Sequence, residues 1–252
     1  MNTTTMNKTP GAARHLKLLS GVLMAGLLLA ATGCSTTKEV SINLEKEQSG
    51  FLGDNYSLLR KGDAKEINYY YLAPSVDWKK YTKIWIKPIE VWPAEDGKSA
   101  LSRYSKDEQQ LLLDYLTSAL IDTLSKNFEM VDHGGPDVLV IHGAITNARK
   151  AKPVINLVTT LYPAALVLSY GKQVVTGSAT GVGVSVVEFE ILDGDTGKLL
   201  VAGMDSRAGT KALRTKFDGT WGDYRLACDW WSRRLGLRLA LFKQGDFTED
   251  KL

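Results

Sequence analysis

The pattern of hydrophobic and polar positions predicts several strands along the chain. Residues 81–89 place Ile84 and Ile86 on one face and lysines on the other, which is the two-residue period of a half-buried strand. Residues 138–145 form an almost unbroken apolar run, typical of a central strand that is covered on both faces. The tyrosines at 69–71 are expected to form a short edge strand.

A second pair of strands is predicted around a hairpin turn. Residues 182–192 carry apolar side chains on both parities, so either a bulge shifts the register or both faces are covered. Residues 193–198 are rich in Asp and Gly, as a tight hairpin turn requires, and residues 199–205 return as the partner strand. A calcium loop is the alternative use of Asp193 and Asp195, but the third oxygen ligand is missing.

Two stretches have the three- and four-residue spacing of amphipathic helices. Ser105 and Glu108 form a capping box that starts the first helix, whose apolar positions continue to Leu124. Residues 221–242 form the second helix, with an apolar face that includes Cys228. The element order is strand, helix, strand, insertion, hairpin, helix. It predicts an α/β (α+β) fold with a single small sheet and two helices packed on one face.

The insertion, residues 153–171, carries no charged residue but contains polar residues and Pro163. We interpret it as a partly helical apolar segment that folds over the domain. The alternative is an apolar contact surface, made by Tyr162, Leu166 and Leu168, that meets the membrane or another subunit.

The N-terminus, residues 1–33, has the order of a lipoprotein signal peptide. Lys8, Arg14 and Lys17 precede an apolar run of about a dozen residues, shorter than the roughly 20 needed to span a bilayer. The run ends in small residues directly before Cys34, as in a lipobox. We expect Cys34 to carry a covalent N-acyl diacylglycerol lipid; the alternative is a plain signal peptide with an incidental cysteine.

The remaining chain divides by composition. Residues 34–48 are polar and are expected to form the lipidated tether, residues 49–245 a single α/β domain, and residues 246–252 a C-terminal tail. Ser35 follows the lipidated cysteine, and the lack of Asp at this position favours the outer membrane, with the domain facing the periplasm.

Composition limits the range of functions. The chain has 31 Lys and Arg and 28 Asp and Glu. Removal of the signal peptide takes away three basic residues and no acidic residue, so the mature chain is formally neutral. The charge therefore gives no reason to expect a nucleic-acid partner. The two cysteines are Cys34 and Cys228. Lipidation of the first precludes an internal disulfide, and the second is expected to be a buried thiol.

Motifs for catalysis are missing from the sequence. It contains no nucleophile elbow, zinc-protease motif or phosphate-binding loop, so no catalytic residue, cofactor or metal site is predicted. His133 and His142 remain after signal removal, and His142, inside an apolar run, is expected to be a satisfied histidine of the core or rim. A carboxylate with a raised pKa, acting as a general base, stays open.

Four short motifs occur in order along the mature chain. They are Ser49-Gly50-Phe51-Leu52 with Tyr56-Ser57, Ile86-Lys87-Pro88-Ile89-Glu90-Val91-Trp92, the turn from Asp193 to Leu200, and Trp221-Gly222-Asp223. Together they resemble the bacterial lipoproteins of domain of unknown function 3313. The resemblance implies an outer-membrane or periplasmic lipoprotein with no assigned activity, and it supplies no catalytic residues.

The element order also resembles the Tol-system N-terminal domain and curli-type export lipoproteins, at the level of fold alone. Three functional hypotheses follow from the sequence. The first is a non-enzymatic outer-membrane lipoprotein that binds envelope proteins, an envelope polymer or itself. The second is an oligomeric export or pore component whose insertion around Tyr162 enters the bilayer. The third is an envelope polymer hydrolase, which would need a cleft with convergent acids.

Overall fold

The structure is a computed structural model, and its description covers residues 1, 37–63, 66–93, 99–150, 182–209 and 220–245. The chain divides into two units, Met1–Ser35 and Thr36–Leu252, and every described helix and strand lies in the second. Within the described residues, no helix is both long enough and apolar enough to cross a membrane.

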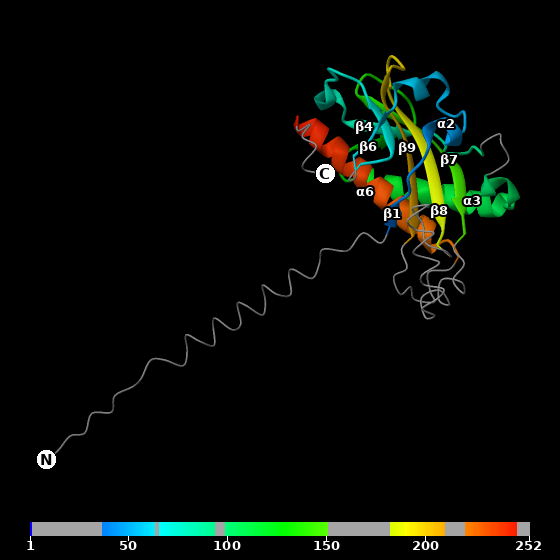
Figure 1. Cartoon of the computed structure of the whole chain (residues 1–252). Helices are drawn as coiled ribbons and strands as arrows, with labels where there is room; N and C mark the ends of the chain where they lie inside the picture. Colours follow the sequence, from blue (N-terminus) through cyan, green and yellow to red (C-terminus); the bar gives the residue numbers. More distant parts are fainter. Residues whose placement is uncertain (2–36, 64–65, 94–98, 151–181, 210–219, 246–252) are drawn as a thin grey trace. The chain divides into compact units, whose positions relative to one another are not determined.

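The described strands form one mixed, nine-stranded sheet (Figure 1). They are β1 (Thr37–Glu39), β2 (Arg60–Lys61), β3 (Tyr69–Leu72), β4 (Lys83–Ile86), β5 (Glu90–Val91), β6 (Glu129–Val131), β7 (Val138–Arg149), β8 (Val184–Asp193) and β9 (Leu199–Gly209). The order is β2-β3-β9-β8-β7-β4-β6, with β1 paired to β9 and β5 to β7. β4 is parallel to β6 and β7, whereas β7, β8, β9 and β3 are antiparallel neighbours.

The prediction of a small sheet is therefore wrong. The strands with a clear apolar pattern lie where the sequence predicts them. The sheet also includes β1, β2 and β5, which have only two or three residues each. A strand of that length is too short to show a two-residue period, so its pairing depends on neighbours that are distant in the sequence.

Two long helices accompany the sheet. They are α3 (Lys106–Leu124) and α6 (Gly222–Gln244), with a short α2 (Leu44–Glu47) and 3-10 helices η2 (Gly53–Leu58), η3 (Trp78–Lys80) and η4 (Ala100–Arg103). The predicted cap of α3 is confirmed, since the Ser105 hydroxyl accepts a hydrogen bond from the Glu108 backbone N–H at 3.2 Å. α6 ends at Gly245, whose φ of 79° suits a glycine C-cap.

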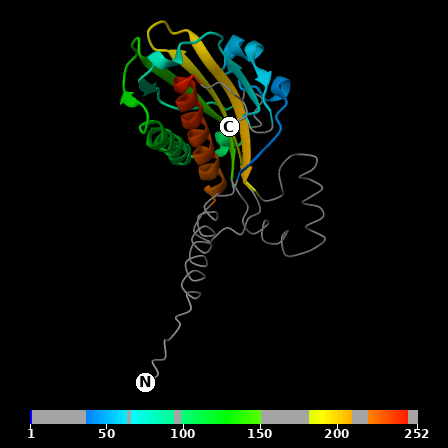
Figure 2. The ribbon, with the colours of Figure 1, turned by 90° about the vertical axis from the view of Figure 1, so that its left-hand side faces the viewer.

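The two faces of the sheet have different coverings. α3 and α6 lie together on one face, and the N-terminal elements (blue) lie on the other (Figure 2). Val187 and Ile191 of β8 pack into the core on the helix side, whereas Val186 packs with Ile42 and Met204. Both faces of β8 are therefore covered, and a register shift between Ile145 and Asn147 of β7 also interrupts its pairing.

The described part of the expected tether contributes to the fold. β1 pairs with the end of β9, in the register Thr37 to Gly209, and Ile42 is 5% exposed in the core. The apolar residues of this polar segment are thus anchors for the sheet, because they meet the face that the helices leave open.

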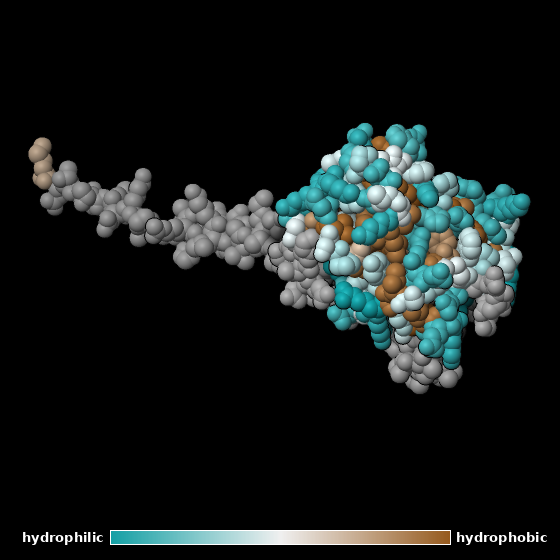
Figure 3. Space-filling model, turned by 90° about the horizontal axis from the view of Figure 1, so that it is seen from above, coloured by the Kyte–Doolittle hydropathy of each residue, from teal (hydrophilic) through white to brown (hydrophobic). Residues whose placement is uncertain are grey.

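Few large apolar side chains of the described residues reach solvent. Besides Met1, those that are well exposed are Leu58, Trp92, Leu111, Ile121 and Leu237. In the view from above, apolar residues (brown) come to the surface between hydrophilic ones (teal; Figure 3). On this face the apolar residues lie next to one another in a narrow, interrupted band (Figure 3).

The predicted hairpin turn between β8 and β9 is confirmed. Asp193 Oδ1 accepts hydrogen bonds from the backbone N–H groups of Asp195 at 3.1 Å and Thr196 at 2.9 Å. Asp193 Oδ2 accepts from Lys80 Nζ at 2.7 Å and from the Tyr81 hydroxyl at 2.6 Å. Both oxygens therefore serve the turn and its junction with η3, which explains the aspartate without a calcium ion.

The turn makes the stability of the protein depend on pH. Burial alone would raise the pKa of Asp193, but hydrogen bonds from Lys80, Tyr81 and Thr196 outweigh it and lower the pKa below the usual 3.8. A lowered carboxyl pKa contributes stability above the unfolded value, and this contribution is lost as the pH falls through the folded value. We expect Asp193→Asn to cost about 1–3 kcal/mol at pH 7. The difference from the unchanged protein should narrow below about pH 4 in urea unfolding.

Asp195→Asn is the matched control for this prediction. Asp195 is exposed in the same turn, and the junction with η3 is made through the Asp193 carboxylate, so we expect a change within about 0.5 kcal/mol. A penalty for Asp193→Asn that stays constant from pH 7 to pH 3 would contradict the assigned role of the charge.

Candidate functional site: an apolar cavity with an arginine-lined mouth

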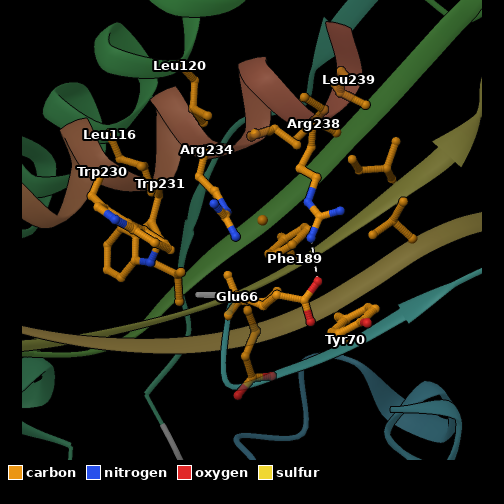
Figure 4. Close-up of a pocket in the computed structure, with 18 of the residues that line it drawn as sticks. Glu66, Tyr70, Leu116, Leu120, Phe189, Trp230, Trp231, Arg234, Arg238 and Leu239 are labelled. Atoms are coloured by element: carbon orange, nitrogen blue, oxygen red, sulfur yellow. Dashed lines mark hydrogen bonds and ion pairs between the residues drawn. The ribbon is translucent and has the colours of Figure 1, made fainter. Parts of the chain in front are cut away.

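An apolar cavity lies between the sheet and the two long helices (Figure 4). Its volume is about 170 Å³. The strands contribute apolar side chains from β7, β8 and β9, among them Ile141, Ala144, Val187, Phe189, Ile191 and Val201. The helices contribute Leu116, Leu120, Trp230, Leu235, Leu239 and Phe242. Engineered apolar cavities of roughly 150 Å³ stay dry and bind benzene, so this space is large enough for a small hydrocarbon group.

The sequence leaves room for this cavity at glycine positions of the sheet. A Cβ atom at Gly203 of β9 would lie 2.6 Å from Ile67 Cδ1 and 2.7 Å from Phe189 Cε1. The glycine therefore allows the Phe189 ring to lie across the neighbouring strand and to form part of the cavity wall.

Charged side chains gather at the mouth of the cavity. Arg234 and Arg238 are four residues apart on α6 and lie on the same side of the helix. Figure 4 shows both reaching from α6 toward the sheet, and Arg238 forms an ion pair with Glu66, from the loop between β2 and β3. Arg60 of β2 also lines the cavity, and its Nη2 donates to the Tyr70 hydroxyl at 2.8 Å.

A buried polar network holds the mouth in place. Asp205 of β9 is completely buried, and its carboxylate accepts from Arg207 Nε at 2.8 Å, Trp231 Nε1 at 2.7 Å and the Asn68 backbone N–H at 2.9 Å. Arg207 also stacks on the Trp230 ring, 3.4 Å from its centroid. The network thereby connects β9 to α6 and to the β2–β3 loop.

Electrostatics at the mouth favour a negative partner. Burial lowers the pKa of Arg234, and the nearby cations Arg238 and Arg207 lower it further, whereas Glu66 and Asp205 raise it. Among the residues that the structure describes, this group contains three arginines and two carboxylates. A partly buried excess of positive charge next to an apolar cavity suits a ligand with an apolar body and an anionic end.

The first family motif contacts the opposite face of the sheet through Glu188. Glu188 of β8 is completely buried, and its carboxylate accepts from the Ser49 backbone N–H at 3.2 Å and from the Tyr56 hydroxyl. Burial raises the pKa of Glu188, and the hydrogen bonds from Tyr56 and Ser49 oppose this shift. The Glu188 carboxylate therefore fastens the N-terminal segment to the sheet and faces away from the cavity.

The other three family motifs also form structural junctions. In the second motif, Trp92 Nε1 donates to the Ser49 carbonyl at 3.3 Å, which connects it to the first. The third motif is the Asp193 turn. In the fourth, Asp223 in the first turn of α6 accepts from the Gly183 backbone N–H at 2.5 Å. The motifs that carry the family resemblance therefore hold the fold together, and the cavity arginines lie outside them.

The structure places the sequence-predicted residues as follows. Cys34 and the apolar contact residues Tyr162, Leu166 and Leu168 lie outside the described residues. Cys228 is fully buried in α6 as predicted, and burial raises the pKa of its thiol above the ordinary value.

His142 has the partners expected of a satisfied histidine. One ring nitrogen lies 3.0 Å from a Glu90 carboxylate oxygen, and the ring packs against Phe51. The described residues contain no cluster of three or more His, Cys, Asp or Glu side chains arranged to hold a metal ion.

Sequence reasoning missed the cavity arginines. The available signal was that Arg234 and Arg238 each come directly before an apolar-face residue of α6, Leu235 and Leu239. This spacing puts both arginines at the border of the buried face. The sequence alone does not show that the sheet leaves a space opposite them.

These features define an α/β domain with a cavity between its sheet and helices. The chain belongs to the family "Protein of unknown function (DUF3313)", which matches residues 47–235, and the predicted family is thereby confirmed. The chain is also similar to the "Uncharacterized lipoprotein YdcL" of Escherichia coli strain K12. The two are 28% identical over 177 residues, which cover 69% of this chain and 75% of that protein.

Two solved structures show a distant likeness. A PelC dodecamer from Paraburkholderia phytofirmans is 11% identical, with 68% of this chain and 94% of that chain covered and a TM-score of 0.36. Protein XCC0632 from Xanthomonas campestris is 8% identical, with 69% and 92% covered and a TM-score of 0.37. The likeness to Tol-system and curli-export domains stays a prediction.

Proposed function

We propose that this protein is a lipid-anchored envelope protein whose domain is a non-enzymatic binding module. The anchor is the N-acyl diacylglycerol lipid on Cys34, and the domain faces the periplasm from the outer membrane. The lipobox, Ser35 and the similarity to a protein named as a lipoprotein support the anchor. One observation carries the binding role, namely the apolar cavity of about 170 Å³ with an arginine-lined mouth.

The side chains around the cavity favour binding over hydrolysis. Of the two glutamates that line it, Glu66 is paired with Arg238, and the carboxylate of Glu188 is held on the opposite face of the sheet by Ser49 and Tyr56. A hydrolase of the kind considered above would need two convergent acids in one cleft. The export or pore hypothesis depends on residues 153–171, which lie outside the described residues, and it stays a prediction.

The binding role is tested with 1-octanol, a neutral ligand with a single chain. The chain from Ser35 onward contains every described helix and strand, and it is purified without detergent so that the cavity stays free of competing amphiphile. We expect one saturable site in isothermal titration calorimetry, with a Kd on the order of 0.1–1 mM for a ligand of this size. Lack of saturable binding would contradict the proposal.

Leu235→Trp tests whether the ligand occupies this cavity. The larger side chain projects into the lining of the cavity, so octanol affinity should fall about tenfold or more. Leu237→Trp is the matched control, because Leu237 is 45% exposed on the same helix and does not line the cavity. Thermal unfolding checks that both variants are folded. Equal affinities in the two variants would place the ligand elsewhere.

A further inference from the structure

The mouth of the cavity already holds a carboxylate that the protein itself supplies. Glu66 is 8% exposed, and its Oε1 pairs with the Arg238 guanidinium, whose side chain is 20% exposed. Glu66 is held at its backbone, because the Glu66 carbonyl accepts from Arg207 Nη2 at 3.1 Å. Arg238 is therefore positioned to hold a carboxylate at the edge of an apolar space (Figure 4).

The charges around this carboxylate leave the mouth positive. Arg207, Arg234 and Arg238 face Glu66 and Asp205 from β9 and α6, and Arg60 adds a further cation from β2. Farther out, Glu39 and Lys61 interact with the same group and carry opposite charges. Arginines therefore outnumber carboxylates among the described residues at the mouth, which favours an anionic ligand group there.

The size of the cavity limits the apolar part of the ligand. A volume of about 170 Å³ is below the roughly 300–1,000 Å³ of pockets for drug-sized ligands and close to that of cavities that take benzene. The space suits a single chain of short or medium length, with the carbons nearest the head group at the open mouth. It does not suit the two long chains of a phospholipid.

We infer that the cavity binds a single-chain carboxylate of short or medium length, with the chain between α6 and the sheet and the carboxylate on Arg234 and Arg238. The inference rests on the proposed binding function and names its ligand class. On binding, the ligand carboxylate takes the place of Glu66 on Arg238, so the Glu66 side chain competes with the ligand. The hydrogen-bond exchange requires no covalent step.

A series of eight-carbon ligands tests the head group on the same protein. Octanoate is expected to bind about tenfold more tightly than 1-octanol, because its carboxylate forms an ion pair with the arginines and the octanol hydroxyl does not. Octyltrimethylammonium should bind more weakly than either, since its cation meets the arginines. Octyl phosphate tests a phosphate head group. If octyl phosphate binds more tightly than octanoate, the assignment to carboxylates is overturned.

Three variants test the named residues. Arg234→Gln should weaken octanoate binding about fivefold or more and weaken octanol binding much less, since only the anion forms an ion pair with the guanidinium. Arg233→Gln is the matched control, because Arg233 is exposed on the same helix and does not line the cavity. Glu66→Gln should increase the affinity for octanoate several-fold, because it removes the competing carboxylate. If Glu66 had only a structural role, Glu66→Gln would weaken the binding of both octanoate and octanol.

The failures of the two proposals are distinguishable. If octanol does not bind, the binding function itself fails. If octanol binds and octanoate binds no more tightly, or if Arg234→Gln and Arg233→Gln are equivalent, the binding function survives and the carboxylate assignment is overturned. Weaker octanoate binding by Glu66→Gln would overturn the competition between the two carboxylates.

Discussion

Asp205→Ala is expected to lower the free energy of unfolding by about 3–5 kcal/mol. The Arg207 side chain is only 6% exposed, so Asp205→Ala leaves a buried guanidinium without the carboxylate that it pairs with. The indole N–H of Trp231 and the backbone N–H of Asn68 also lose their acceptor. Urea unfolding, followed by tryptophan fluorescence, measures the loss.

Two controls separate the lost charge partner from other effects. Asp122→Ala removes an exposed carboxylate from α3 and should change stability by no more than about 0.5 kcal/mol. Burial raises the pKa of Asp205 even though Arg207 and the hydrogen bonds oppose it, so the ion pair does not fully offset its desolvation. Asp205→Leu with Arg207→Met should therefore cost about 1–3 kcal/mol less than the two single changes added together. Additive costs would show that the two residues are not coupled.

Cys34→Ala is expected to move the protein completely from the outer-membrane fraction to the soluble periplasmic fraction. Each CH₂ group of a membrane-inserted acyl chain contributes about 0.8 kcal/mol, and an anchor of several chains is lost with the one thiol that carries it. Sucrose-gradient fractionation of cells, followed by immunoblotting, measures the change.

Cys228→Ala is the matched control for the anchor. Cys228 is fully buried in the core, so its loss should leave the protein in the outer-membrane fraction. A Cys34→Ala protein that still sediments with outer membrane would contradict the lipid anchor. If the protein without substitutions sediments with the inner membrane, the role given to Ser35 is contradicted and the lipid anchor is not.

Elements with strong local signals could be predicted from the sequence. The Ser105 cap, the apolar face of α6 and the Asp193 turn all appear where their patterns place them. Each depends on residues within a few positions of one another, so hydrogen bonding and side-chain periodicity are readable along the chain.

The extent of the sheet could not be predicted in this way. β1 and β2 are polar and short, and their strand conformation depends on pairing with β9 and β3. The same holds for the burial of Glu188, a charged residue in the middle of a strand pattern. Its burial follows from Ser49 and Tyr56, which are more than 130 positions away.

The sequence by itself predicted the export signal and the lipid attachment at Cys34, and it determined the family and the principal helices and strands. Only the tertiary structure decided where the cavity lies and which charges surround it. Glu66, Arg207 and Arg238 come from three separate parts of the chain. Their meeting depends on how α6 packs across the sheet, because burial between two elements leaves no periodic signal for the space that remains between them.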